Sequence, residues 1–291
     1  MINNNSEFYM KCLYESGRNR RDALQITYEL GGIGAHIGGT LSLIEVMTVL
    51  YLGFVNFDKN NAYSESRDRV IFSKGHGALA LYTAMRSAGI ISNEVLGEYK
   101  HNDTLLSAHP SINQELGIEF SSGSLGQGLS LGVGVCLALE RKKNATSKVY
   151  VILGDGECNE GSVWEAAESA AHFGCNRLVA VIDRNHLQYD GNTAEVMNDI
   201  SLEEKWRSFG WDVSAIDGHN VVSIVEALTM EHTKPRVIIA DTVKGKGVSF
   251  MENNPVWHNH ALNKKQYEQA IRDAKEMEAT QERMLVEAGI C

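Results

Sequence analysis

The sequence predicts an α/β fold with a central parallel β-sheet flanked by helices. Residues 149–153 and 178–182 are continuous apolar runs rich in β-branched side chains, which is typical of strands buried on both faces of a parallel sheet. Between them, apolar and small residues recur at helical spacing over residues 161–173. A helix of this length between two strands favours a parallel, adjacent arrangement of the strands.

The other elements follow from the same apolar spacing, in chain order. Before the two central strands we expect a helical region over residues 3–31, a short apolar helix over 41–52 and a helix rich in Gly, Leu and Ala over 124–141. After them we expect two strands, at residues 212–216 and 236–242, and a charged helix over 264–288. A chain of 291 residues can bury one large α/β core. We therefore expect a single domain over residues 1–291, with helical N- and C-terminal extensions.

The composition narrows the class of protein. A hydrophobic content of 43% and a charged content of 22% are typical of a globular protein, and no apolar run approaches the roughly 18 residues of a membrane span. The formal net charge of −10 argues against a nucleic-acid partner. The polar residues 1–5 show no signal-peptide pattern, and five cysteines without a Cys-x-x-Cys pair indicate reduced thiols. We expect a cytoplasmic protein that binds neither membranes nor nucleic acid.

Polar residues follow the two apolar strands at the point where each strand ends. Asp155 and Asn185 would lie side by side, because the carboxyl ends of adjacent parallel strands are roughly 4.8 Å apart. Two hard oxygen ligands at that separation suit Mg²⁺ or Ca²⁺, and the carbonyl of Leu187 is a natural third ligand. Gly156 lacks a Cβ, so its N–H can approach a phosphate at a helix start. Gly-Asp-Gly alone is usually a turn, but the joint placement predicts a pocket for a metal-bound diphosphate.

The motifs around these strand ends resemble those of a known family. Residues 154–161, with 164–166 and 183–185, are similar to the thiamine-diphosphate signature of transketolases. Four further segments resemble that family in the same order along the chain: residues 34–42, 68–77, 108–110 and 117–128. The resemblance covers nearly the whole chain. It implies a thiamine-diphosphate-binding fold, with thiamine diphosphate and Mg²⁺ as cofactors and Ca²⁺ as a substitute for Mg²⁺.

The resemblance also implies roles for individual residues in holding the cofactor. The metal ligands would be Asp155, Asn185 and the carbonyl of Leu187. The cofactor-binding residues would be His76, Gly123, Leu125, Gly156, Asn185, His258, Glu160 and Glu165. Of these, the two histidines and Gly156 would contact the diphosphate, whereas Gly123 and Leu125 would line the thiazolium and pyrimidine rings. The two glutamates match acidic positions at the interface between cofactor sites, although acidic residues near a helix start also have a purely structural explanation.

Three histidines are implied as catalytic: His36, His109 and His258. His36 and His109 would face the ketose hydroxyls and the intermediate, where a neutral imidazole can donate or accept a proton near pH 7. In related chains Gly and Lys usually follow the third histidine, but Asn259 and His260 stand there in this sequence. His260 is therefore an alternative to His258, and the preceding tryptophan favours His258.

The length of the chain points to a partner. A complete transketolase also has a pyrimidine-binding domain, which carries the glutamate that activates the cofactor, and a third, smaller domain. We therefore expect the amino-terminal subunit of a split transketolase, completed by a carboxy-terminal subunit in an α2β2 assembly. Its activity would be transfer of a two-carbon ketol unit between sugar phosphates, with pentose phosphates as the default. A truncated chain, a 2-oxo acid dehydrogenase or deoxyxylulose-phosphate synthase type of enzyme, and a non-catalytic cofactor-binding subunit are the alternatives.

Overall fold

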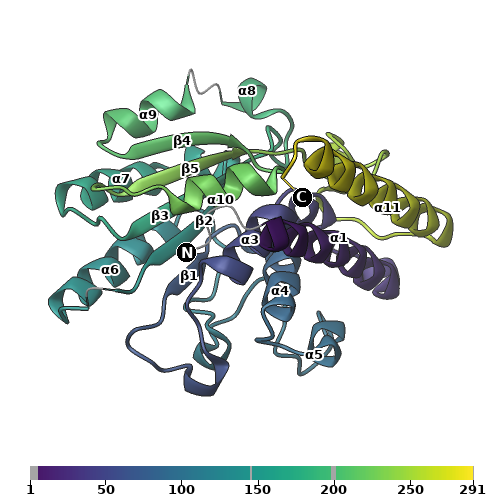
Figure 1. The fold of residues 1–291 in the computed structure, drawn as a ribbon, viewed down its shortest axis with the longest axis horizontal. Coiled ribbons are helices and arrows are strands. Elements are labelled where there is room, and N and C mark those ends of the chain that lie inside the picture. Colours follow the sequence, from purple (N-terminus) through teal and green to yellow (C-terminus); the bar gives the residue numbers. More distant parts are fainter. Residues whose placement is uncertain (1–5, 145, 198–200, 291) are drawn as a thin grey trace.

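A five-stranded, fully parallel β-sheet forms the centre of the protein in the computed structural model, which describes residues 6–144, 146–197 and 201–290. The strand order is β1-β2-β3-β5-β4 (Figure 1). The strands are β1 Arg69–Phe72, β2 Val149–Gly154, β3 Leu178–Arg184, β4 Asp212–Asp217 and β5 Arg236–Asp241. The predicted α/β fold with a central parallel sheet is confirmed.

Eleven α-helices among the described residues surround this sheet. They are α1 Ser6–Glu29, α2 Ile37–Leu41, α3 Ile44–Gly53, α4 Ala78–Ser87, α5 Asn93–Gly97, α6 Gly128–Arg141, α7 Gly161–His172, α8 Thr193–Val196, α9 Leu202–Ser208, α10 Val221–Thr229 and α11 Lys264–Glu287. Short 3₁₀ helices lie at Gly31–Ile33, Lys59–Asn61, Gly75–Gly77, Gln114–Leu116, Gly156–Asn159 and Pro255–His258. No helix in the described part of the chain is long and apolar enough to cross a membrane.

Alternation along the strands divides the core into two layers. On β2, Tyr150 and Ile152 point into the larger layer, which they share with α1, α3, α4 and α10. Val149, Val151 and Leu153 point into the opposite layer, which α6, α7 and α9 cover. Because side chains alternate between the faces of a sheet, a strand must be apolar at every position to serve both layers. This explains why β2 and β3 are uninterrupted apolar runs.

The predicted pairing of the two central strands is confirmed. β2 and β3 are parallel neighbours, with Gly154 opposite Asp183, and α7 connects them. The predicted helices differ mainly at their starts. The helix expected from residue 41 begins at Ile44, after the separate turn of α2, and the helix expected from residue 124 begins at Gly128. Residues 3–5 of the predicted first helix, the polar start and Cys291 lie outside the described residues.

The two long terminal helices lie side by side (Figure 1). Tyr28 of α1 stacks on Tyr267, near the start of α11, with ring centroids 4.5 Å apart. The carboxyl ends of β1, β2, β3 and β5 all lie at one edge of the sheet, because the strands are parallel. The segment after β5 contacts α1 at this edge, where Arg20 donates to the carbonyl of Lys246. The segments that follow these four strands build the site, together with the segment around His36, which precedes α2.

Candidate active site

A carboxylate ties together the loops after β2 and β3. Asp155 accepts through Oδ1 from the N–H of Gly156 at 2.8 Å and through Oδ2 from the N–H of His186 at 2.7 Å. Asn185 accepts through Oδ1 from the N–H of Leu187 at 3.2 Å. The strand ends thus bring Asp155, Asn185 and Leu187 together, as their spacing predicted.

A second, deeper carboxylate orients the asparagine. Asp183 is fully buried and accepts through Oδ2 from the side-chain amide of Asn185 at 3.0 Å and from the Ser42 hydroxyl at 2.6 Å. It also pairs with the Lys74 ammonium and accepts from the Thr242 hydroxyl. Burial opposes ionisation of Asp183, but Lys74 and these donors outweigh it and hold its pKa below the ordinary value. Because the amide nitrogen of Asn185 faces Asp183, its oxygen remains available to a cation.

The donor set at this edge fits a hard divalent cation. Asp155 is only 8% exposed, and burial together with the neighbouring Asp183 charge raises its pKa. It forms no ion pair with any described residue, whereas buried charges are normally paired or bound to a metal. No group of three or more His, Cys, Asp or Glu in that part of the chain could hold a metal. A metal here would use one carboxylate with the amide oxygen of Asn185 and the carbonyl of Leu187, which suits Mg²⁺.

Lys244, for which the sequence predicted no role, lies beside the proposed metal ligands. The ammonium of Lys244 donates to the carbonyl of Leu187 at 3.1 Å and to Nδ1 of His258 at 3.3 Å. Burial, and then the charge of Lys74, lower its pKa to about 8. Lys244 follows β5, the neighbour of β3, so its place after a strand end is a signal that could have identified it. The Lys244 ammonium beside the metal ligands makes this edge suitable for an anion such as a diphosphate.

Four predicted histidines converge next to this edge. The ring of His36 is central: its centroid lies 5.4 Å from that of His109, 5.4 Å from that of His258 and 6.1 Å from that of His76. His76 and His258 are 5.3 Å apart. Tyr189, which is 76% exposed, contacts His258 edge-on at 5.4 Å. The four imidazoles come from chain segments up to 222 residues apart, counted from His36 to His258, so only the fold brings them together.

The cluster holds its imidazoles in the neutral form. Burial, followed by the charges of neighbouring groups, lowers the pKa of both His36 and His258 to about 4. The same causes lower the pKa of His76 well below its ordinary value and lower that of His109. Nδ1 of His36 is buried and has no hydrogen-bond partner among the described residues. The site therefore offers proton donors and acceptors near pH 7 without adding positive charge.

The geometry distinguishes His258 from His260. The ring of His258 lies in the cluster, whereas the ring of His260 packs on Trp257 at 4.8 Å and the residue is exposed. The backbone of His260 pairs instead with Ala35, the residue before His36. The 3₁₀ helix Pro255–His258 thus places His258 at the site and turns His260 away from it.

The glycine-rich loop reaches the site beside β1. A Cβ at Gly75 would lie 2.5 Å from the Ser122 hydroxyl and 3.1 Å from Cδ2 of His109, so this close approach requires glycine. Gly123 is exposed and helps to line a cavity of about 280 Å³, and Leu125 is half-buried beside it. The Ser122 hydroxyl is buried and has no hydrogen-bond partner among the described residues, which leaves it available to a ligand.

A buried glutamate, noted in the sequence only as part of a motif, holds this loop in place. Glu157 accepts from the N–H of Gly126 at 2.9 Å, from the N–H of Gly154 at 3.1 Å and from the Ser73 hydroxyl. It is 2% exposed, and burial raises its pKa. One side chain therefore ties the glycine-rich loop to the ends of β1 and β2.

Comparison with known proteins identifies the family. Residues 28–285 match the sequence profile described as "Transketolase, thiamine diphosphate binding domain". The chain belongs to the transketolase family. It is 40% identical over 265 residues to one of the subunits of apulose-4-phosphate transketolase from Phocaeicola vulgatus, covering 90% of this chain and 93% of that protein. It is also 40% identical over 249 residues to "6-deoxy-6-sulfo-D-fructose transketolase subunit SqwG" of Clostridium sp. strain MSTE9, covering 84% and 90%.

Solved transketolase structures show the same fold. The crystal structure of transketolase from Campylobacter jejuni matches with a TM-score of 0.79 at 24% identity, over 97% of this chain and 49% of that chain. This chain is therefore about half as long as that single-chain transketolase but spans nearly all of its two subunit relatives. The resemblance to the amino-terminal part of a split transketolase is confirmed.

Of the predicted cofactor contacts, Gly156 lies differently from the expectation, and two glutamates lie at the surface of the isolated chain. The N–H of Gly156 is engaged by Asp155, and a single 3₁₀ turn, not the start of α7, follows it. A Cβ at Gly156 would lie 3.0 Å from the Gln188 side chain, so glycine is needed for packing. Glu160 and Glu165 are exposed at the start of α7. An interface position is exposed in an isolated chain, so their suggested roles remain predictions.

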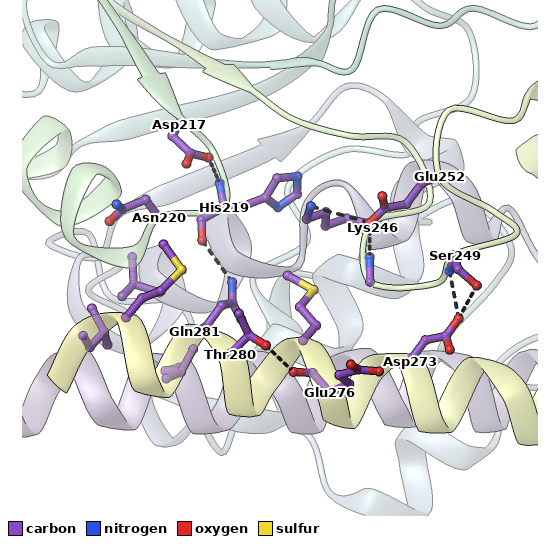
Figure 2. Close-up of a pocket in the computed structure, with 16 residues that line it drawn as sticks. Asp217, His219, Asn220, Lys246, Ser249, Glu252, Asp273, Glu276, Thr280 and Gln281 are labelled. Carbon is purple, nitrogen blue, oxygen red and sulfur yellow. Dashed lines mark hydrogen bonds and ion pairs between the residues drawn. The ribbon is translucent and has the colours of Figure 1, made fainter. Parts of the chain in front are cut away.

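A larger cavity of this transketolase chain lies apart from the site. It has a volume of about 490 Å³ and opens between α11 and the loop of residues 246–252 (Figure 2). His219 lies in its wall and accepts through Nε2 from the N–H of Val243, next to Lys244. None of the predicted site residues lines this cavity, so it has no place in the chemistry of the histidine cluster.

Proposed function

We propose that this chain is the amino-terminal subunit of a two-chain transketolase that transfers a two-carbon ketol unit from a ketose to an aldose, using thiamine diphosphate and Mg²⁺. The observation that carries the proposal is the cluster of four neutral imidazoles, in which His258 contacts the Lys244 ammonium. Lys244 in turn contacts the Leu187 carbonyl, at the edge that carries the buried Asp155 carboxylate. One side of this arrangement suits a metal-bound diphosphate, and the other suits a polyhydroxy substrate.

The cofactor end would be held by groups already in place. Asp155, Asn185 and the Leu187 carbonyl would ligate Mg²⁺, and Lys244 with His76 and His258 would face the diphosphate. The Leu187 carbonyl has two lone pairs, so it can accept from Lys244 and hold a cation as well. When bound, thiamine diphosphate supplies an electron sink for the pair of electrons released as the C2–C3 bond of a ketose breaks.

The substrate end would depend on His36 and His109. Their rings are in contact and their pKa values are lowered, so both are neutral at pH 7. A neutral imidazole can accept a proton from a sugar hydroxyl and return it later in the cycle. The buried, unpartnered Nδ1 of His36 favours such a hydrogen bond from the substrate. Partial burial of the four imidazoles limits their contact with water, which strengthens each of these contacts.

We propose that the substrates are anionic sugars. The names of the two subunit relatives specify a sugar phosphate and a sulfonated sugar. The relatives are subunits by name, which supports a carboxy-terminal partner that supplies the pyrimidine-binding domain. We further propose an α2β2 assembly that works in the cytoplasm, since the four described cysteines are buried thiols in no disulfide, as a reducing compartment requires.

The test is ketol transfer from xylulose 5-phosphate to ribose 5-phosphate, with thiamine diphosphate and Mg²⁺, by the chain alone and after mixing with its partner subunit. We expect activity only in the mixture, and loss of that activity in Asp155→Ala. Full activity of Asp155→Ala in the assembled enzyme would favour a non-catalytic cofactor-binding subunit. Turnover of pyruvate without ketose turnover would favour a 2-oxo acid enzyme and would contradict the proposal.

A further inference from the structure

One lysine beside the histidine cluster has no charged partner. The ammonium of Lys100 donates to the backbone carbonyl of Gly34 at 2.8 Å, two residues before His36. It forms no ion pair with any residue in the part of the chain that the structure describes. Lys74, by contrast, is neutralised by Asp183. Lys100 is therefore a half-buried cation that lacks a counter-ion.

The backbone conformation around Lys100 fixes the position of this residue. Its φ angle is +63°, in the left-handed region that side chains other than Gly rarely adopt. Its N–H donates to the carbonyl of Leu106 at 3.0 Å, which closes the loop that leads on to His109. Holding a lysine in this conformation costs free energy, which the hydrogen bonds of the surrounding loop must offset.

The ammonium lies at the substrate end of the cluster. Burial lowers the pKa of His109, and the Lys100 charge lowers it further; the same charge contributes to the low pKa of His36. The metal edge and Lys244 lie on the other side, where Lys244 contacts His258. His36 lies between, 5.4 Å from both His258 and His109. In space, the groups therefore follow one another in this order: the metal ligands, Lys244, His258, His36, His109 and Lys100.

A ketose that reacts at the cofactor must extend away from the metal edge, past His36 and His109. We propose that Lys100 is a specificity-determining residue of this subunit, which binds the terminal tetrahedral oxyanion of the sugar, either a phosphate or a sulfonate. An unpaired, partly buried ammonium is suited to such a group, because it acts as a point charge with three donors. This inference rests on the proposed ketol transfer. It adds that this chain itself contributes a residue that binds the far end of the substrate.

The test compares charged and uncharged donors in the assembled two-subunit enzyme, with uncharged glycolaldehyde as the acceptor. For Lys100→Met we expect KM for fructose 6-phosphate to rise about tenfold with kcat nearly unchanged, because a charge-assisted hydrogen bond made equally in ground and transition states is lost. KM for fructose should not change, and Lys100→Arg should keep most of the affinity. A parallel series with 6-deoxy-6-sulfofructose identifies the anion, because the preferred group shows the larger loss.

Lys59→Met is the matched control, since the Lys59 ammonium also donates to a backbone carbonyl, that of Gly89 at 2.8 Å, on an exposed helix away from the site. It should change neither KM. Equal losses with fructose and fructose 6-phosphate in Lys100→Met would mean that Lys100 only positions the loop, and would overturn the proposal. Unchanged kinetics with every donor would overturn it as well.

Binding separates this inference from the proposed function. If the wild-type assembly transfers ketol units from none of these donors, the proposed function fails, and calorimetry with ribose 5-phosphate alone still reports on Lys100. A Kd about tenfold weaker in Lys100→Met than in wild type, with Lys59→Met unchanged, supports the oxyanion site. Equal Kd values for wild type and Lys100→Met would refute it.

Discussion

The side-chain amide of Asn185 donates to Oδ2 of Asp183 at 3.0 Å, and this contact decides which atom of Asn185 faces the site. Asp183 is fully buried, and its charge is balanced by Lys74. An asparagine can present either an oxygen or an amide group, but a carboxylate behind it accepts only from the amide. The proposed metal ligand is thus oriented by a residue that would not touch the metal.

Asp183→Asn should damage both stability and cofactor binding. The change leaves Lys74 buried without its partner, which we expect to lower the free energy of unfolding by about 3 kcal/mol. Asp183 also accepts the hydrogen bond that orients Asn185, a proposed metal ligand. Loss of that bond should weaken Mg²⁺-dependent binding of thiamine diphosphate at least about tenfold. Urea unfolding and calorimetric titration measure the two effects. Asp58→Asn is the control, because Asp58 is an exposed helix cap and Asn caps equally well.

The histidine cluster should make stability depend on pH. In the unfolded chain histidines take up a proton near pH 6.5, but in the folded chain His36 and His258 do so only near pH 4. Between these values the unfolded state binds more protons, so the free energy of unfolding should fall as the pH is lowered from 6.5 toward 4. The measurement is the urea midpoint across this range, in wild type and in the double variant His36→Asn, His258→Asn. Equal pH slopes for the two proteins would contradict the assignment.

His258 and His260 should differ in their importance for activity. His258→Ala removes a ring that contacts both His36 and His76 and would face the diphosphate, so kcat of the assembled enzyme should fall about 100-fold through misplacement of the reacting groups. His260→Ala removes an exposed ring packed on Trp257 and should leave kcat close to wild type. Steady-state kinetics with saturating thiamine diphosphate gives the comparison. The reverse order of effects would place His260 at the cofactor.

Glu157→Gln should loosen the glycine-rich loop without altering its sequence. A glutamine presents one acceptor oxygen, so the N–H groups of Gly126 and Gly154 and the Ser73 hydroxyl cannot all be satisfied. We expect a loss of about 2 kcal/mol in the free energy of unfolding and faster amide exchange at Gly126. Glu168→Gln, on the exposed side of α7, is the matched control. Unchanged exchange at Gly126 would show that the loop is held in another way.

Local patterns in the sequence were sufficient to predict the framework of the site. Uninterrupted apolar runs predicted β2 and β3 as adjacent parallel strands, and parallel strands place their carboxyl ends at one edge. Asp155 and Asn185 were therefore predictable from position alone. Family motifs then predicted His36, His76, His109 and His258, and the structure brings their rings together.

What the sequence by itself determined is the parallel pairing of the two strands that carry the metal ligands and the identity of the polar residues at their ends, because continuous apolar runs and crossover length are local properties. Only the tertiary structure decided how those residues behave. The low pKa of His36, the contact of Lys244 with the Leu187 carbonyl, the anchoring of the glycine-rich loop by Glu157 and the isolated charge of Lys100 all depend on groups distant in the chain. Burial and charge are set by every segment packed around a residue, and no short stretch of sequence contains that information.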